Sequence, residues 1–494
     1  MSDAGRFTDD WPEAVYTPQV VPAYQGNPFI EALPPVVDDD GAIDGMQNLV
    51  TATDAERALP SVHRMHVLAG VTRFMQPLDY HVDLFHRVSI LLRQGYVERN
   101  PTSPRFVRDL MECTAELARL VKEMGNPAHG KVKAGTRRRI GAGSSLTLLG
   151  TSGVGKSTAV EAILRCYPQV ICHAEIKGPL AAVYQLVWLK LSVPPDGSIK
   201  ALCIDFFEAV DEVLGTDYVR LFVNTHATVD KLIVVMGRVA FLHGLGMLVI
   251  DELQNLNVAK SGGPEKMMNT FKLLRDVVRI PVVCIGTHEA VAILSADLQT
   301  ARRNSGLEPM QRMTNDPQFK LFCDSLFAAQ FLRQPLALTP EIVSKLHYLS
   351  QGIADVVVKL FVSAQTRALS TGMETMTQAM FDDAYDREMG LLHPFLEKLR
   401  NKEGVDGPSF DKALLATRVP EASPAPAEGA APPPDPKPSV QGVKARRPRR
   451  AKGEESACLL VRVVEDAARK QVPPHQALLE AGFIRPLGAE ALAG

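Results

Sequence analysis

The stretch 146–164, LTLLGTSGVGKSTAVEAIL, constrains the fold more than any other part of the chain. An apolar run that predicts a strand is followed by a glycine-rich loop and by a run with helical periodicity. The loop matches G-x-x-x-x-G-K-[ST], in which backbone N–H groups and a helix N-terminus surround a phosphate. We therefore expect an α/β nucleotide-binding domain in which the following loop residues bind the cofactor: Gly150, Thr151, Ser152, Gly153, Val154, Gly155, Lys156, Ser157 and Thr158.

Two further predictions assign the chemistry of this site. Lys156 would place its charge between the β- and γ-phosphates of ATP, and the Ser157 hydroxyl would be a ligand of Mg²⁺. In GMLVIDELQNL an apolar run ends at Asp251 and Glu252, as expected for a buried strand whose acids emerge at its carboxyl edge. Asp251 would hold the Mg²⁺ shell and Glu252 would orient the attacking water. A carboxylate that activates water favours an ATPase over a kinase.

A third strand, in IPVVCIGTHEA, ends at Gly286 and Thr287. Thr287 would sense the γ-phosphate, although Thr287 or His288 could instead cap the following helix. Downstream, Arg302 and Arg303 could act on the nucleotide of a neighbouring subunit, because an arginine supplied in trans stabilises the transferring phosphoryl group. Surface salt bridges are the alternative role for these arginines.

The spacing of apolar runs predicts the organisation of the whole chain. Short strands alternate with amphipathic helices between about 146 and 290, which indicates a parallel sheet with helices on both faces. Helical periodicity precedes and follows this region, and Thr339–Pro340 has the pattern of a helix start. We expect an extended arm at 1–61, a helical prelude with a basic linker at 62–140 and an ATPase core at 141–334. A helical lid at 335–403, a Pro-rich and basic disordered linker at 404–453 and an amphipathic tail at 454–494 would follow.

Composition excludes several classes of protein. The net charge of −2 argues against a globally basic nucleic-acid coat, so any DNA contact needs a local patch. The seven cysteines show no C-x-x-C pair, which is typical of reduced thiols rather than a disulfide framework. The N-terminus is acidic, and no apolar run approaches the roughly 20 residues of a membrane span. We expect a cytoplasmic protein with no membrane partner.

Together these motifs resemble those of the AAA+ ATPases, and more narrowly the TnsC/TniB family of ATP-dependent regulators of DNA transposition. The resemblance covers residues 27–402 and rests on the ATPase motifs, on LQTARRN and EKLRNKE, and on two segments that carry the narrower assignment, GNPFIEALPP and LSQGIADVVVKLF. It implies an AAA+ P-loop fold with a helical lid, and a homo-oligomer that forms a ring or helical filament on double-stranded DNA without sequence preference. It also implies transposase subunits and a target-selector protein as partners, and a bacterial cytosol or nucleoid location.

The resemblance places the DNA-facing surface between the P-loop and the acidic strand, where Lys190, Ser198 and Lys200 are the candidates. The basic runs 137–139 and 446–450 are rivals for this role, and Lys200 could simply be a solvated helix residue. The resemblance also suggests that the tail binds a transposase subunit; packing against the ATPase core is the alternative.

The lid departs from many AAA+ proteins, which carry an arginine after the glycine that here is Gly352. The residues that follow are Ile353, Ala354 and Asp355. We infer a weak grip on nucleotide and a slow, regulatory ATPase rather than a fast motor. A replication initiator or helicase loader, a non-catalytic nucleotide-gated scaffold and a signalling switch without DNA are the alternative functions.

Overall fold

The computed structural model describes residues 11–124, 145–174, 176, 183–194, 197–223, 227–255, 280–290 and 309–401. Its centre is a four-stranded sheet in which all neighbouring strands are parallel, in the order β1-β6-β5-β4. The strands β5 and β6 are buried throughout, which explains why their sequences are continuous apolar runs rather than alternating ones. The predicted parallel sheet is confirmed, and its strands are β1 (Ser145–Leu149), β4 (Trp188–Ser192), β5 (Met247–Asp251) and β6 (Val282–Gly286).

The strand order brings the three predicted motifs to one edge of the sheet. Strand β6 pairs with β1 on one side and with β5 on the other, so Thr287 follows the strand between the P-loop and the acidic pair. On the outer side of β1, the Met310 N–H donates to the Leu149 carbonyl over 2.7 Å. The segment that leads toward the lid therefore lies directly beside the P-loop.

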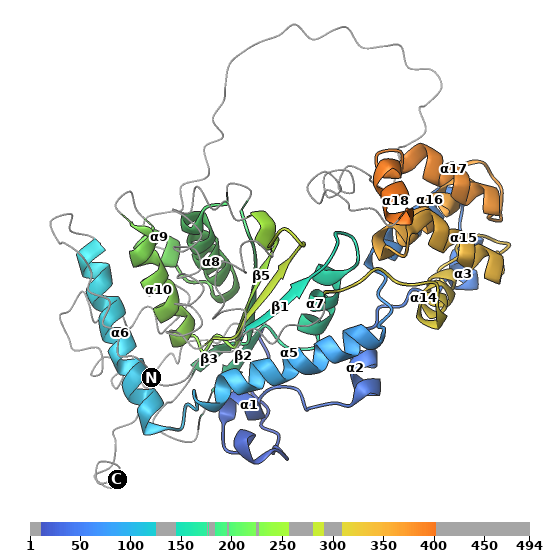
Figure 1. Cartoon of the computed structure of the whole chain (residues 1–494). Helices are drawn as coiled ribbons and strands as arrows, with labels where there is room; N and C mark the ends of the chain where they lie inside the picture. The colour runs from blue at the N-terminus through green and yellow to red at the C-terminus, as the bar shows by residue number, and fades with distance from the viewer. Residues whose placement is uncertain are drawn as a thin grey trace, which may run out of the picture.

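Helices cover the sheet in two groups, with the strands between them (Figure 1). Contacts join the members of each group, and α8 also packs on β4. One group consists of α6 (Pro104–Met124), α8 (Ile199–Leu214), α9 (Tyr218–Phe222) and α10 (Val229–Leu242); the other consists of α1 (Pro28–Glu31), α2 (Asp39–Met46), α5 (Asp79–Val97) and α7 (Lys156–Arg165).

An antiparallel hairpin stands apart from the main sheet. Its strands are β2 (Val170–His173) and β3 (Val183–Leu186), and Val187 separates β3 from β4. The segment 183–192 therefore divides between two sheets. Residues 12–14 extend the hairpin, because the Ala14 N–H donates to the Cys172 carbonyl over 2.8 Å and the Cys172 N–H donates to that of Pro12 over 2.9 Å.

A second hydrophobic core lies in the helices after Met313. The predicted helix start at Thr339 is confirmed, since its side chain accepts the Ile342 N–H and Pro340 occupies the first turn. In Figure 1 these helices, coloured yellow to orange, form a body beside the main sheet and the helices that cover it. They are α14 (Pro317–Phe327), α15 (Pro340–Ser350), α16 (Ala354–Ser370), α17 (Gln378–Glu388) and α18 (His393–Arg400).

The N-terminal region contributes to both cores. Phe29 is fully buried against the rings of Tyr96 and Phe106 in the hydrophobic core around the main sheet. Further along, Leu68 and Val71 belong to the core of the lid, and α3 lies among the lid helices in Figure 1. The elements of this stretch are η1 (Pro22–Tyr24), α3 (Asp54–Ala58), α4 (Ser61–Leu68) and η2 (Ala69–Arg73). The range expected as an extended arm thus contains short helices, while the proposed domain boundaries stay a prediction.

No helix among the described residues has the length and apolar character needed to cross a membrane.

Candidate nucleotide site

The P-loop, the acidic pair and Thr287 line one cavity of about 1150 Å³ between the ATPase core and the lid. Within the loop, Gly153 and Gly155 have φ of 78° and 103°, values that a side chain disfavours. A Cβ on Gly150 would lie 2.5 Å from the Met310 carbonyl oxygen. The glycines are therefore required by backbone conformation and by close packing, and the loop can present its N–H groups to a phosphate.

Lys156 begins helix α7 and is held within the loop. Its ammonium donates to the carbonyl oxygens of Gly150 and Thr151, at 3.0 and 2.8 Å. The side chain is buried, so its charge lies in a region where water screens it little. This position fits the role predicted for Lys156 beside the phosphates of a nucleotide.

Asp251 is buried at the end of β5, and one of its oxygens accepts the Glu252 N–H over 2.8 Å. The other oxygen lies 3.1 Å from the ammonium of Lys190. Lys190 also pairs with Glu161 on the P-loop helix. Burial alone would lower the pKa of Lys190, but the hydrogen bond to Glu161 and the nearby carboxylates outweigh it and raise the pKa.

Lys190, one of the candidates for DNA contact, lies on the strand face that carries Asp251. Strand β4 places Ser192 in register with Asp251, so Lys190, two residues earlier, lies on the same face as that aspartate. In this structure its ammonium pairs with two carboxylates, and its role in DNA contact stays a prediction.

Glu252 and Thr287 meet through a residue that the sequence analysis did not single out. The Gln254 amide donates to the Glu252 carboxylate and accepts the Thr287 N–H over 3.1 Å. The Thr287 hydroxyl is buried and lines the cavity, and it makes no hydrogen bond among the described residues. A buried hydroxyl of this kind is suited to a partner on a bound ligand.

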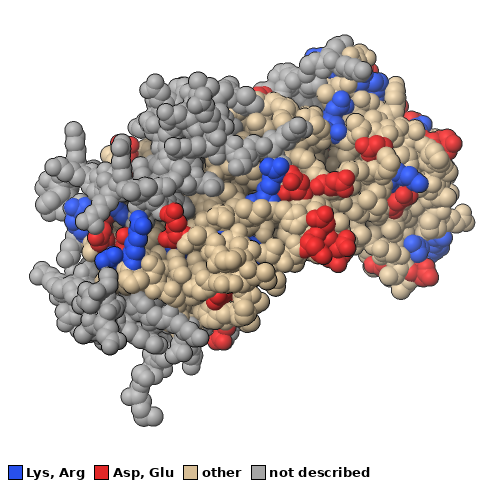
Figure 2. Space-filling model, turned by 60° about the horizontal axis from the view of Figure 1, so that its bottom comes forward, with Lys and Arg blue, Asp and Glu red and all other residues tan. Residues whose placement is uncertain are grey.

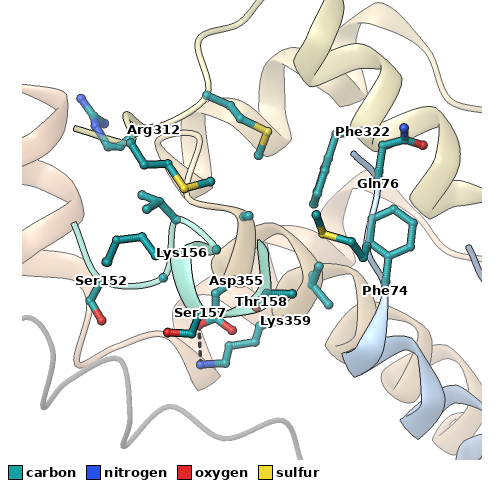
Figure 3. A pocket seen from close by; sticks show the side chains of 18 of the residues that line it. Phe74, Gln76, Ser152, Lys156, Ser157, Thr158, Arg312, Phe322, Asp355 and Lys359 are labelled. Carbon is teal, nitrogen blue, oxygen red and sulfur yellow. Dashed lines mark ion pairs between the residues drawn. The ribbon is translucent and has the colours of Figure 1, made fainter. Parts of the chain in front are cut away.

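The end of the cavity away from the phosphate loop is apolar. Figure 3 shows Phe74, Gln76 and Phe322 on one side of the pocket, with Ser157 and Lys359 at the other. Phe74 comes from the N-terminal region and Phe322 from α14, so two distant segments build a wall suited to a nucleotide base. No motif in the sequence marks these residues.

The lid contacts the P-loop directly. The Asp355 N–H donates to the Gly153 carbonyl over 3.1 Å, and its carboxylate pairs with Lys359 at 2.8 Å, the dashed line in Figure 3. Asp355 thus lies beside the P-loop, and Lys359 adds a cation one turn later on the same helix. Arg312 also lines the cavity, and burial lowers its pKa.

Mg²⁺ fits this site with a small set of protein ligands. Ser157 and Asp251 both line the cavity, whereas no group of three or more His, Cys, Asp or Glu side chains with metal-ligand geometry occurs in the described part of the chain. Mg²⁺ usually keeps several waters and takes one or two protein ligands plus phosphate oxygens. The residues present therefore suit Mg²⁺ bound together with a nucleotide.

The other candidates for DNA contact, Ser198 and Lys200, lie at the start of one helix. Helix α8 begins at Ile199 with Ser198 as its N-cap, whose hydroxyl accepts the Ala201 N–H over 3.3 Å, and Lys200 lies half-buried in the first turn. On the face seen in Figure 2, described basic and acidic side chains are interspersed rather than gathered by sign. The predictions for Arg302, Arg303, the basic runs 137–139 and 446–450, the linker at 404–453 and the tail at 454–494 lie outside the described residues.

A P-loop strand, a neighbouring strand followed by threonine, a third strand followed by the acidic pair, and a helical lid over the shared cavity form an AAA+ P-loop fold. Residues 132–311 match the family model described as "Bacterial TniB protein". The resemblance to TnsC/TniB-type AAA+ proteins is therefore confirmed over this range, which contains the P-loop, the acidic pair and Thr287. The arm and lid segments lie outside the matched range.

Several solved structures resemble the chain at low identity. The Walker-type ATPase PABY2304 of Pyrococcus abyssi is 13% identical, with 58% of this chain and 75% of that one covered and a TM-score of 0.34. The ORC1 protein of Aeropyrum pernix, solved in complex with DNA, is 17% identical, with 62% and 71% covered and a TM-score of 0.35. Cdc6p from Pyrobaculum aerophilum is 13% identical, with 59% and 82% covered and a TM-score of 0.36. We base no functional conclusion on these likenesses. No curated protein matches the sequence.

Proposed function

We propose that this chain is an ATP-hydrolysing regulator of DNA transposition, which assembles on duplex DNA when ATP is bound and connects target-site selection with a transposase. One observation carries the proposal: the P-loop, the acidic pair and Thr287 line a single cavity, within a range that matches the TniB family.

The nucleotide chemistry follows from the side chains in the cavity. Lys156 brings a buried positive charge to the phosphates, and Ser157 and Asp251 would hold Mg²⁺, which supplies further charge neutralisation when bound. Glu252 orients the attacking water and accepts its proton. The Thr287 hydroxyl is buried, and the Thr287 N–H is bound by Gln254, which also contacts Glu252. The hydroxyl is placed to bind the γ-phosphate or that water.

The lid favours a regulatory ATPase over a fast motor. Asp355, rather than a cation, occupies the start of α16 beside the P-loop, and its carboxylate partly neutralises Lys359. A lid with this charge pattern contributes less to binding the γ-phosphate than a lid arginine would. Hydrolysis would then act as a timer that dismantles the DNA-bound assembly.

Assembly and DNA binding complete the proposal. Arg302 or Arg303 would reach the nucleotide of the next subunit, so that ATP is hydrolysed between copies in a ring or filament. Backbone N–H groups at the start of α8, near Ser198, and the ammonium of Lys200 would contact DNA phosphates. Transposase subunits and a target-selector protein would bind the assembled form.

The test combines an ATPase assay with electron microscopy of the full chain on duplex DNA. We expect ATP-dependent assemblies on DNA and hydrolysis that requires Mg²⁺. Lys156→Ala should abolish both, because the phosphates lose their buried counter-charge, whereas Glu252→Gln should assemble normally and hydrolyse ATP poorly. Lys320→Ala, an exposed lysine on α14 outside the cavity, is the matched control and should behave as the parent. Parental turnover in Glu252→Gln would refute the assigned role, and assembly without nucleotide would refute the ATP-dependent mechanism.

A further inference from the structure

Gln254 connects the ends of two neighbouring strands through its side chain. Its amide nitrogen donates to a carboxylate oxygen of Glu252 over 2.5 Å, and its amide oxygen accepts the Thr287 N–H over 3.1 Å. Glu252 follows β5 and Thr287 follows β6, so one side chain spans the two strand ends that border the phosphate loop.

The chemistry of the two partners fixes the orientation of the amide. A carboxylate can only accept at this position, and a backbone N–H can only donate. The nitrogen of Gln254 must therefore face Glu252 and the oxygen must face Thr287. Neither glutamate nor lysine could satisfy both partners, because the first lacks the donor and the second lacks the acceptor.

The backbone is bent in a way that makes this contact possible. Glu252 has φ of 57°, a left-handed conformation that is unfavourable for a residue with a side chain. The turn is held by the Glu252 N–H, which donates to Asp251, and by the Asn255 N–H, which donates to the Glu252 carbonyl over 2.9 Å. These bonds start the short helix η3 (Leu253–Asn255) and turn Gln254 back toward β6.

At Gly286 strand β6 passes close to η3, and a Cβ there would lie 2.9 Å from the Ala290 Cβ. A Cβ at this position would lie 3.4 Å from the Gln254 amide oxygen and 3.2 Å from the Leu253 Cβ. The close approach of β6 to η3 therefore keeps the Gln254 oxygen within reach of the Thr287 N–H.

We propose that Gln254 is a positioning residue for ATP hydrolysis: it holds the Glu252 carboxylate in the orientation that activates water and ties it to the strand end that carries Thr287. Gln254 acts through Glu252 and not on the nucleotide itself. This inference rests on the proposed ATPase function, and it adds a residue to which neither the P-loop nor the acidic motif assigns a role.

The first test separates positioning from binding. In Gln254→Met the side-chain length is kept and both hydrogen bonds are lost. We expect kcat to fall by about ten- to a hundredfold, because a carboxylate displaced by about 1 Å from its productive position can cost a hundredfold in rate. KM for ATP, nucleotide affinity and the thermal midpoint should stay within about twofold or a few degrees of the parent values. A matching loss of nucleotide affinity, or unchanged kcat, would contradict the proposal.

A matched pair of variants then identifies which hydrogen bond matters. Gln254→Glu keeps an acceptor for Thr287 but sets a second carboxylate against Glu252, whereas Gln254→Lys keeps a donor for Glu252 and loses the acceptor. We expect Gln254→Lys to retain the larger kcat. If Gln254→Glu is at least as active as Gln254→Lys, the donor to Glu252 has no positioning role and the proposal is wrong.

A double-mutant cycle gives the last criterion. Once Glu252→Gln has removed the carboxylate, adding Gln254→Met should reduce kcat little further, since the two residues act as a unit. Independent, multiplicative losses would overturn the proposal. Failure of this proposal can be distinguished from failure of the ATPase function itself. If the parent shows no Mg²⁺-dependent hydrolysis, the ATPase function is refuted. If Gln254→Met keeps the parental kcat while Glu252→Gln is inactive, only the role of Gln254 is refuted.

Discussion

Arg64 and Glu374, 310 positions apart in the sequence, form a bidentate ion pair that fastens the N-terminal region to the lid. The two N–O distances are 2.7 and 2.8 Å, and the Arg64 side chain is 1% exposed. Arg64 also donates to the Phe331 carbonyl over 3.0 Å. Because η2 connects Arg64's helix to Phe74 in the nucleotide cavity, this pair fixes the segment that forms the cavity's apolar wall.

Removing the arginine should therefore destabilise the lid. In Arg64→Met the apolar stem is kept, but Glu374 and the Phe331 carbonyl lose the hydrogen bonds from the Arg64 guanidinium. We expect the free energy of unfolding to fall by on the order of 2 kcal/mol, since the remaining carboxylate can still reach water. Urea denaturation of the full chain, followed by circular dichroism, measures this change. Arg333→Met is the control: Arg333 is exposed and 3.8 Å from the same carboxylate, so its loss should cost less than about 0.5 kcal/mol.

The same pair makes stability depend on pH in the acid range. The hydrogen bond from Arg64 lowers the pKa of Glu374 from 4.5 to about 2. A carboxyl group with a lowered folded-state pKa stabilises the fold above its unfolded pKa and loses that contribution as the pH falls toward the folded value. We expect the parent to lose more stability than Glu374→Gln between pH 4.5 and 2. Parallel stability curves for the two proteins over this range would show that the pair contributes nothing.

The strand ends could be predicted from the sequence because each follows a simple pattern. An apolar run long enough for a buried strand, ending in Asp251 or Thr287, places a polar side chain at the carboxyl edge of a parallel sheet. The side-chain pairs could not be predicted in this way. Lys190 and Asp251 meet only because β4 and β5 are neighbours in a particular register, and periodicity does not give the order of strands.

The position of Phe74 in the cavity wall is a second feature that could not be predicted from the sequence. This residue precedes the P-loop by more than seventy positions in the chain, and a helical pattern such as that of 62–128 does not indicate which body it packs on. The structure divides the N-terminal region between two cores, an outcome decided by long-range packing rather than by local propensity. Gln254 belongs to the motif that ends the acidic strand, but its two hydrogen bonds, to Glu252 and Thr287, depend on the left-handed turn at Glu252. Sequence patterns disfavour such a turn at residues other than glycine.

Lys190 and Lys200 should differ in what they affect. Lys190→Met removes a cation 3.1 Å from the proposed Mg²⁺ ligand Asp251, so less Mg²⁺ should be needed for half-maximal ATPase activity while DNA affinity is unchanged. Lys200→Met should leave the Mg²⁺ dependence unchanged, weaken DNA binding similarly across sequences and reduce the salt slope by about one. Magnesium titrations and DNA binding at several salt concentrations separate the two. The reverse pattern would identify Lys190 as the DNA contact.

A shared active site predicts complementation between inactive subunits. The double variant Arg302→Ala/Arg303→Ala would provide an intact P-loop without the arginine, and Lys156→Ala would provide the arginine without a working P-loop. Mixed assemblies on DNA should regain part of the ATPase activity, because some interfaces combine the two intact halves. Mixing Lys156→Ala with Glu252→Gln is the control, since both lesions lie in the same half of the site and no interface is complete. Absence of recovery in assemblies shown to contain both chains would argue against an arginine supplied in trans.

The tail at 454–494 should serve a partner rather than the ATPase. Its first part, ACLLVRVVEDAARK, has apolar residues at helical spacing opposite charged ones, and Pro473 and Pro474 interrupt the pattern. Two short helices, as this pattern predicts, would bury too little apolar surface to be stable alone, so we expect the tail to need a partner surface. Deleting residues 405–494 should leave ATP hydrolysis and DNA-dependent assembly within about twofold of the parent and remove binding to the transposase. Gel filtration and calorimetry establish that the shortened chain folds. If it folds poorly or loses ATPase activity, the tail packs on the ATPase core and is not a docking segment.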